Sequence, residues 1–286
     1  MIVIIGFIVV TSCVLGGFAM AGGSRGALVH PAEIVTIAGA SLGALIVMST
    51  KKVLADLVKG IIQTIKGSPF NRQMYDDLFR VMYDLMRTAR KDGLLVLESH
   101  LSSPHESHLF AKYPLIFDNH HAMEFIVSGW SLLVEGTVRK EQLPELFDVE
   151  LSVVEQEHHL PITALAKTAD GLPGFGIVAA VMGIVITMGH IDGPVEEIGH
   201  MVGAALVGTF LGILLSYGFF GPMAARMELL GVAELTFFRT AAGIIVSFAN
   251  DLPPKVAIEK ARRSVGTDVR LTRTELEELF KQVDTQ

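Results

Sequence analysis

Two long apolar stretches, Leu172–Gly189 and Met201–Gly221, contain few side chains that could handle an ion. Neither stretch has an Asp, Glu, Lys or Arg. Their polar side chains are four hydroxyl groups, those of Thr187, Thr209, Ser216 and Tyr217. Proteins that relay protons usually carry a carboxylate within the membrane. If this protein moves ions, another chain must therefore supply the charge.

Thr209 is the hydroxyl nearest the middle of its stretch, and it lies between Gly208 and Gly212. Two glycines four residues apart allow another helix to approach closely. A threonine hydroxyl in a helix commonly donates to a carbonyl of the preceding turn of the same helix. The alternative is that Thr209 faces a polar group brought by a partner.

Charged and histidine-rich segments elsewhere offer little chemistry by themselves. Charged residues flank Gly93 in the stretch Arg90–Glu98. The composition of this stretch alone indicates a solvated surface. The pairs His120-His121 and His158-His159 suggest a metal site, but neighbouring residues on a helix point about 100° apart and make a poor bidentate ligand. No nucleophile motif, phosphate-binding loop or dinucleotide fingerprint is present, so we expect neither a metal site nor an enzyme.

The two apolar stretches are long enough to position these groups inside a membrane. Each can cross a hydrocarbon core of ~30 Å at ~1.5 Å per helical residue. The polar turn His190–His200 joins them into a hairpin, so Pro173 and Pro222 should lie at the same membrane face. Pro173 opens its span, where proline costs little, whereas Pro222 follows an apolar run and should kink or stop the helix. The alternative is that both prolines are simple helix punctuation.

Two further spans are predicted near the N-terminus, Met1–Ala21 and Ala32–Thr50. Ala19-Met20-Ala21 is typical of a signal-peptidase site, but no Lys or Arg precedes the apolar stretch, so we expect a retained span. Pro31 starts the second span. Glu33 follows near its mouth, where we expect it at the interface or beside the positive helix N-terminus.

The charge distribution orients these spans. The chain has 286 residues, 50% of them hydrophobic and 19% charged, and a mean hydropathy of +0.49. Of its 23 Lys and Arg, 13 fall in Lys51–Asp170, 9 in Met223–Gln286 and one at Arg25. The positive-inside rule therefore places both termini and Lys51–Asp170 in the cytoplasm. The net charge of −7 gives no indication of nucleic acid binding, and the single cysteine, Cys13, excludes an internal disulfide.

The predicted fold is an all-α membrane protein with four transmembrane helices. We expect a two-span hairpin over residues 1–50, a cytoplasmic helical domain over 51–170, a core hairpin over 171–222 and a cytoplasmic tail over 223–286. Helical periodicity marks residues 54–65 and 78–86, with breaks at Gly67-Ser68-Pro69, Gly93 and Ser102-Ser103-Pro104. The tail continues the fourth span, breaks at Pro253-Pro254 and ends in a helix with a capping box at residues 272–275.

Several of these segments resemble the MotA family of bacterial flagellar motor stator proteins. The resemblance rests on Arg90–Glu98, on the Pro173 region, on the run Val202–Leu215, on Gly16-Gly17 and on Pro31-Ala32-Glu33. It covers nearly the whole chain in order and spacing. The third and fourth spans are shared with the TolQ and ExbB energisers, whereas the long loop with its Arg90–Glu98 motif singles out the stator.

The resemblance implies an inner-membrane ring of five subunits around the helices of a MotB-like dimer. That partner would carry the missing membrane aspartate and anchor to peptidoglycan. Arg90 and Glu98 would meet opposite charges on the rotor switch protein FliG. Pro173 and Pro222 would border the ion path and transmit movement to the cytoplasmic domain.

The resemblance also indicates the ion. Sodium-driven relatives carry a threonine where this chain has Ala179-Ala180, beside the threonine equivalent to Thr209. A dehydrated sodium ion needs several oxygen ligands, whereas a proton needs one carboxylate and a water path. With methyl groups at Ala179 and Ala180, we expect a proton-driven motor without a cofactor.

Three other functions compete with the stator. A self-sufficient channel or transporter is disfavoured by the lack of an internal charge and of repeated halves. A TolQ-like energiser of an outer-membrane process is disfavoured by four predicted spans rather than three. A membrane scaffold whose loop only recruits partners is the third.

Overall fold

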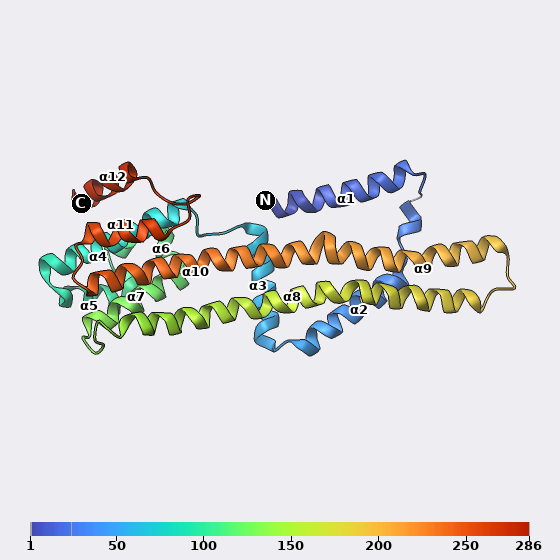
Figure 1. Cartoon of the computed structure of the whole chain (residues 1–286), viewed down its shortest axis with the longest axis horizontal. Coiled ribbons are helices and arrows are strands. Elements are labelled where there is room, and N and C mark those ends of the chain that lie inside the picture. The colour runs from blue at the N-terminus through green and yellow to red at the C-terminus, as the bar shows by residue number, and fades with distance from the viewer. Residues whose placement is uncertain (1, 24, 286) are drawn as a thin grey trace. The chain divides into compact units, whose positions relative to one another are not determined.

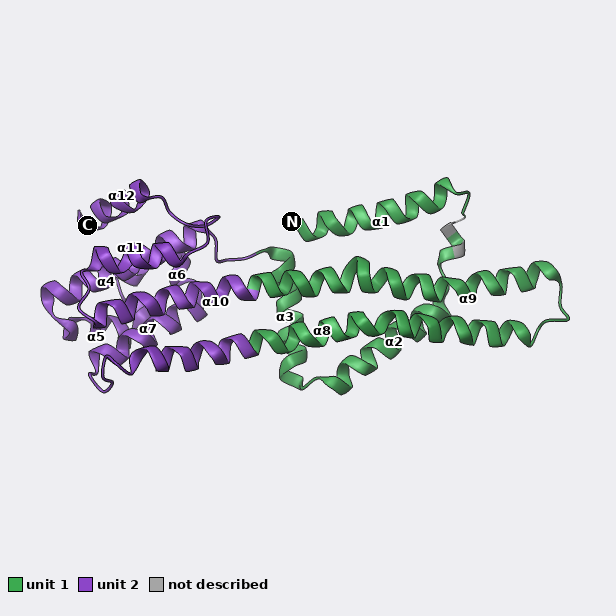
Figure 2. Ribbon diagram, viewed as in Figure 1, with its two compact units in different colours: residues 1–67, 157–230 green, residues 68–156, 231–286 purple. Residues whose placement is uncertain are grey.

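The computed structural model describes residues 2–23 and 25–285, and that part of the chain contains helices and no strand (Figure 1). Packing divides the chain into two compact units, Met1–Gly67 with Glu157–Leu230 and Ser68–Gln156 with Gly231–Gln286 (Figure 2). The predicted boundaries at residues 50, 170 and 222 separate membrane segments from cytoplasmic segments. The two units are instead defined by which residues pack together. Residues 231–286 of the predicted tail accordingly belong to the same unit as most of the predicted cytoplasmic domain.

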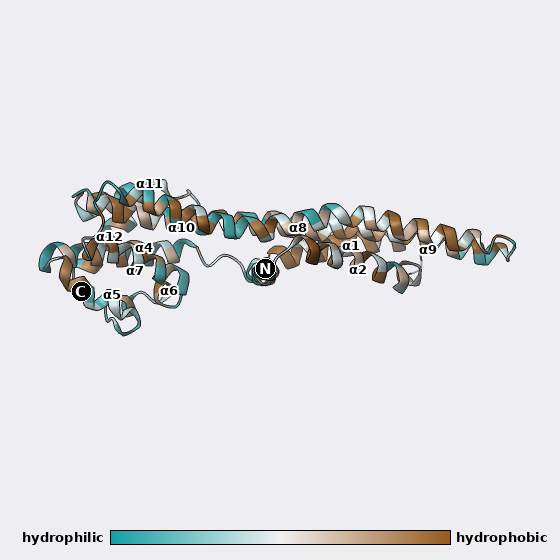
Figure 3. Cartoon of the chain, turned by 90° about the horizontal axis from the view of Figure 1, so that it is seen from below, coloured by the Kyte–Doolittle hydropathy of each residue, from teal (hydrophilic) through white to brown (hydrophobic). Residues whose placement is uncertain are grey.

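Within residues 2–23 and 25–285, four helices are long and apolar enough to cross a membrane, as predicted. They are α1 (Ile2–Met20), α2 (Pro31–Met48), α8 (Leu143–Met188) and the continuous helical stretch Val195–Ala249. Their apolar portions are the long hydrophobic segments of Figure 3. In α1 no residue is buried within the chain, which suits a helix whose side chains face lipid or another subunit.

Pro173 does not open a helix, contrary to the prediction. It lies inside α8, a helix of 46 residues that also contains Pro161. Proline removes one backbone hydrogen bond to the preceding turn. The helix nevertheless continues through Pro173, and its Leu172 and Ala179 are buried in an apolar cluster with Ile37 of α2.

Pro222 does not stop its helix either. The stretch Val195–Ala249 comprises α9 (Val195–Leu215), the π-helical turn η5 (Ser216–Phe220) and α10 (Gly221–Ala249). The Gly221 N–H donates to the Ser216 carbonyl five residues back, and not to the one four residues back. A π turn of this kind gives the proline ring room within a continuous helix, and such turns often mark functional positions.

The turn between the third and fourth spans is shorter than predicted. Helix α9 begins at Val195, after Pro194 at its N-cap, so only the first half of His190–His200 is a turn. Glu196 and Glu197 lie in the first turn of α9, where the positive end of the helix dipole favours carboxylates. The polar residues therefore extend the helix beyond the apolar run.

Helix α3 (Lys51–Lys66) follows α2 directly, with Thr50 as its N-cap. Its Leu57 packs with Leu165, Met223 and Met227, which ties α3 to the first unit. The helix ends at Gly67, whose φ of 107° is accessible to glycine and rarely to other residues.

The second unit is a helical bundle around an aromatic core. It contains part of α8, part of α10 and the following elements: α4 (Arg72–Asp92), η2 (Leu94–Leu97), α5 (Glu98–Ser102), η3 (Pro104–Glu106), η4 (Phe110–Lys112), α6 (Pro114–Phe117), α7 (His120–Val134), α11 (Pro254–Ser264) and α12 (Arg273–Asp284). Trp130, Phe79 and Phe237 are buried there. Burying each such ring contributes about 1.5–3 kcal/mol, so the bundle has a substantial core of its own.

The predicted breaks in this unit are confirmed. Helix α4 ends at Gly93, whose φ is 91°, and α5 ends before Pro104. Helix α11 starts at Pro254. The capping box at α12 is present, with reciprocal bonds between Thr272 and Glu275. These hydrogen bonds and the Arg72 guanidinium lower the pKa of Glu275 to about 2.

Candidate functional site

The third and fourth spans pack backbone against backbone. A Cβ atom at Gly176 would lie 2.7 Å from the Gly208 carbonyl oxygen, and a Cβ atom at Gly212 would lie 2.6 Å from the Leu172 carbonyl oxygen. Only glycine allows such an approach, so these residues set the spacing of the hairpin. The contact places Ala179 against Gly208 and hence brings the neighbouring residues Ala180 and Thr209 to the same level.

The Thr209 hydroxyl differs from the other threonine hydroxyls of the spans. Thr11, Thr36 and Thr187 each donate to a carbonyl four residues earlier. Among the described residues, no hydrogen-bond partner is found for the half-buried Thr209. The hydroxyl is thus not bonded to its own helix among the described residues, and a polar group brought by a partner stays a prediction. Ala180, also half-buried, adds no polar group at this level.

The two prolines lie at the same end of the hairpin, as predicted. Leu172, next to Pro173, shares an apolar cluster with Phe220, two residues before Pro222. Pro173 is half-buried, and Pro222 is exposed beside the π turn. Both irregularities of the long helices therefore occur where the apolar hairpin ends.

Arg90 is used within its own unit. Its guanidinium donates to the carbonyl oxygens of Asp251 and Leu252, at 3.0 and 2.8 Å, and lies 5.8 Å from the centre of the Phe248 ring. Asp251 has a φ of 62°, which is uncommon for a residue other than glycine. Arg90 thus holds the turn that follows α10, in addition to presenting charge at the surface.

Glu98 begins α5 and is exposed, and no described residue forms an ion pair or hydrogen bond with its carboxylate. Between Arg90 and Glu98 lie Leu94, Leu95 and Val96, which are all exposed, Leu95 by 73%. Sequence reasoning missed this apolar strip, although three apolar residues directly after Gly93 are visible in the printed sequence. A charged pair flanking exposed apolar side chains is a suitable surface for a protein partner.

Glu33 lies in the first turn of α2, beside the positive helix N-terminus, which is one of the two predicted placements. Its burial was not predicted: it is only 8% exposed, and its Cγ lies 3.3 Å from the point where a Gly208 Cβ would be. The sequence pattern around Glu33 describes α2 alone, whereas burial comes from α9, 175 residues further along the chain. Gly208 has no side chain, and this leaves space for the glutamate.

The histidines do not gather into a metal site. Among the described residues, no group of three or more His, Cys, Asp or Glu side chains could hold a metal ion. His100 Nδ1 lies 2.9 Å from Ser107 Oγ, and its ring centre lies 4.8 Å from that of His108. Burial, with a smaller effect of His108, lowers the pKa of His100. His120 lies 3.4 Å from Glu124, within its own helix.

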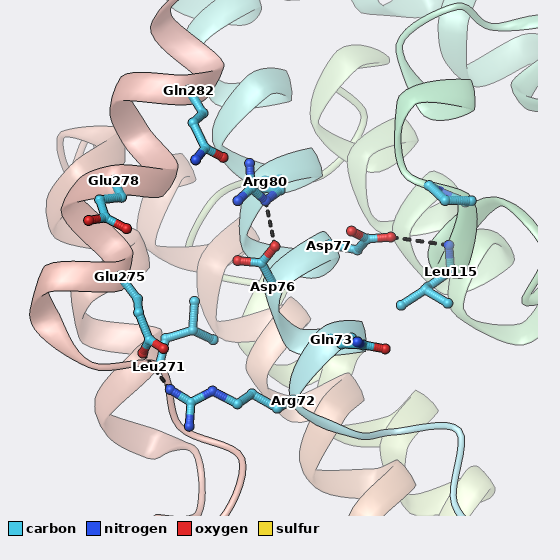
Figure 4. Close-up of a pocket in the computed structure, with 11 residues that line it drawn as sticks. Arg72, Gln73, Asp76, Asp77, Arg80, Leu115, Leu271, Glu275, Glu278 and Gln282 are labelled. Carbon is cyan, nitrogen blue, oxygen red and sulfur yellow. Dashed lines mark hydrogen bonds and ion pairs between the residues drawn. The ribbon is translucent and has the colours of Figure 1, made fainter.

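A surface cavity of 550 Å³ lies between α4, α6 and α12 (Figure 4). Arg80 pairs with Asp76 at 2.5 Å, and Arg72 pairs with Glu275. Asp77 accepts a hydrogen bond from the Leu115 N–H at 3.1 Å, and burial raises the pKa of its carboxyl. The Arg72–Glu275 pair joins the tail helix α12 to α4, whereas the Arg80–Asp76 pair lies within α4.

Comparison with known proteins agrees with this arrangement of helices. Residues 4–93 match the family model Motility protein A N-terminal, and residues 118–240 match the MotA/TolQ/ExbB proton channel family. Motility protein A of Escherichia coli (strain K12) is 37% identical over 283 residues, which cover 99% of this chain and 96% of that protein. Chemotaxis protein LafT of Vibrio parahaemolyticus is 36% identical over 273 residues, with 96% of each chain covered.

Solved structures show the same fold. The structure of C. jejuni MotAB matches with a TM-score of 0.78 at 19% identity, covering 95% of this chain and 98% of that chain. The flagellar MotAB stator complex from Bacillus subtilis matches with a TM-score of 0.74 at 23% identity, covering 90% and 92%. From the identity and coverage of its relatives, the chain belongs to the motility protein A family.

Proposed function

We propose that this chain is a flagellar motor stator subunit that, with a MotB-like membrane partner, couples inward proton flow across the inner membrane to torque on the rotor. The observation that carries the proposal is the α8–α9 hairpin. Its apolar spans have no charged residue, and no partner for the Thr209 hydroxyl is found among the described residues. Such a hairpin can line a path around a carboxylate that another chain supplies.

The assembly follows from the same chemistry. A single hairpin cannot enclose an ion path, so several copies must surround the partner's helices, and we infer a ring of five. Helix α1 buries none of its residues within the chain, which leaves its apolar surface for lipid or neighbouring subunits. The lysines and arginines favour cytoplasmic termini and a cytoplasmic second unit.

The second unit transmits movement to the rotor. We infer that Arg90, Glu98 and the exposed strip between them contact FliG. Pro173 lies in α8, and the π turn η5 immediately precedes α10, which contains Pro222. Helices α8 and α10 each contribute residues to both units. A change at the ion path can bend these helices at those positions, because each lacks a regular backbone hydrogen bond there.

Deletion of the gene tests the proposal. Cells that lack this chain should assemble flagella of normal number and length but should not swim, and re-expression should restore swimming. A TolQ-like energiser would instead leave swimming intact and weaken the outer membrane, which detergent sensitivity would report. Normal swimming of the deletion strain would contradict the stator function.

Topology can be measured separately by cysteine labelling. Cys13 is exposed and must first be replaced, with Cys13→Ala as background. In that background we expect an impermeant maleimide to label Gly193→Cys in intact cells and to label Ala111→Cys only after permeabilisation. Strong labelling of Ala111→Cys from outside would contradict the cytoplasmic placement of the second unit.

The rotor contact is tested by charge reversal. Arg90→Glu should reduce swimming more than Arg90→Ala, because repulsion replaces a lost attraction. A compensating reversal on the rotor protein should restore swimming to Arg90→Glu. An expressed Arg90→Glu protein that supports normal swimming would exclude Arg90 from the contact.

A further inference from the structure

Glu33 is a buried carboxylate that the stator function, as described so far, does not use. It lies in the first turn of α2 and is 8% exposed. Its Cγ lies against α9, 3.3 Å from the position of a Gly208 Cβ. No described residue forms a hydrogen bond or ion pair with its carboxyl group. Within a span, an ionisable residue in such a position is a functional-site candidate.

The surroundings of Glu33 are apolar. Residues 172–188 of α8 and 201–215 of α9 contain no Asp, Glu, His, Lys or Arg. Along the chain, the nearest titratable groups are His30, at the N-cap of α2, and Arg25. A carboxyl group in these surroundings needs either a proton or a cation, because an isolated carboxylate is costly outside water.

The depth of Glu33 places it beside the candidate ion path. Gly208 is the eighth residue of the apolar run that begins at Met201, so it lies about 10 Å inside that run at ~1.5 Å per residue. Gly208 also faces Ala179 and precedes Thr209. Glu33 is therefore at the level of Thr209 and Ala180, the two residues assigned to the path.

We propose that the Glu33 carboxyl group is a proton-binding site on the ion path, carried by this chain in addition to the carboxylate of its partner. The existence of an ion path in this inference rests on the proposed function. The burial of Glu33 is a feature of the structure and does not depend on that function. The helix N-terminus alone would explain a glutamate in the first turn. It would not explain its burial against Gly208, since a first-turn glutamate can be stabilised equally well at the surface.

The first test is chemical modification of the stator complex purified with its membrane partner. Dicyclohexylcarbodiimide is apolar and adds to protonated carboxyl groups, so mass spectrometry can report modification of each glutamate as a function of pH. We expect Glu33 to be modified at low pH and progressively less as the pH rises. The exposed Glu196 is the internal control, and it should react with a water-soluble carbodiimide instead. Absence of Glu33 modification at every pH would overturn the proposal.

The second test is functional and uses Glu33→Gln, with Glu196→Gln as the matched control. The midpoint of swimming speed against pH should shift in Glu33→Gln, because removing one of two interacting sites changes the pH dependence of the pair. It should not shift in Glu196→Gln. An unchanged midpoint in a Glu33→Gln protein that assembles would overturn a role on the path.

A third variant covers the case in which Glu33→Gln fails to assemble. Glu33→Asp keeps the acid and should retain both the pH-dependent modification and motility. If Glu33→Asp is equally unable to assemble, and wild-type Glu33 is unmodified, the residue is structural. Modification by carbodiimide does not require rotation, so failure of the stator function would not be mistaken for failure of this proposal.

Discussion

The Arg90 guanidinium donates to the main-chain carbonyl of Leu252 at 2.8 Å and so joins the end of α4 to the turn after α10. The two residues are 162 positions apart in the chain. Arg90 is therefore a structural element of the second unit, in addition to its proposed role as a charge that faces the rotor. Glu98, by contrast, is exposed and has no partner among the described residues.

This difference predicts separable effects of two neutralising substitutions. Arg90→Ala removes hydrogen bonds to Asp251 and Leu252 and should lower the free energy of unfolding by about 1–2 kcal/mol. Glu98→Gln removes no internal contact and should leave stability unchanged while reducing motility. Thermal unfolding of the purified complex and swimming speed give the two readouts. Equal stability of both variants would show that the Arg90 bonds contribute nothing.

The prolines should affect rotation more than membrane insertion. Pro173→Ala and Pro222→Ala restore a backbone N–H and should make α8 and α10 more regular. We expect both variants to remain in the membrane and to co-purify with the partner, while rotation of tethered cells slows or stops. Loss of the variants from the membrane would support simple helix punctuation instead.

The hairpin spacing can be tested with one added methyl group. In Gly212→Ala the new Cβ would lie 2.6 Å from the Leu172 carbonyl oxygen, so the spans must separate and the partner complex should be lost. Gly199→Ala, in the same helix, meets no atom within 4 Å and serves as the control. Co-purification with the partner measures the effect. Similar yields of both variants would show that the backbone contact is dispensable.

The second unit should lose stability in mild acid because of His100. Burial lowers the pKa of His100 in the folded protein, so the unfolded chain binds the proton more readily. The stabilising contribution is complete above the ordinary histidine pKa of about 6.5 and is lost as the pH falls through the lower folded value. The unfolding temperature of the wild-type protein should therefore fall as the pH is lowered below about 6.5. It should fall less in His100→Asn. An equal drop in both proteins would assign the effect to other groups.

Local features were predictable from the sequence. The four spans follow from apolar runs, and the ends of α3 and α4 follow from Gly67 and Gly93. The capping box follows from the Thr272 and Glu275 pair. Each of these signals lies within a few residues of the structure it specifies, so no knowledge of packing was required.

The rest depends on contacts between distant segments. Phe70 packs against Phe237, and Arg90 reaches Leu252, so the tail joins the bundle through residues that no local pattern links. The burial of Glu33 required Gly208 in another helix. At Pro222 the helix continues through a π turn and does not end. The periodicity of the sequence does not distinguish a π turn from a helix break.

In the proposed function, protons passing beside Thr209 drive rotation. The direct measurement is swimming speed against external sodium at fixed pH, with and without a protonophore, in cells whose stators contain this chain. With only methyl groups at Ala179 and Ala180, we expect speed to be independent of sodium and to be abolished by the protonophore. A speed that rises with sodium and survives the protonophore would contradict a proton-driven motor.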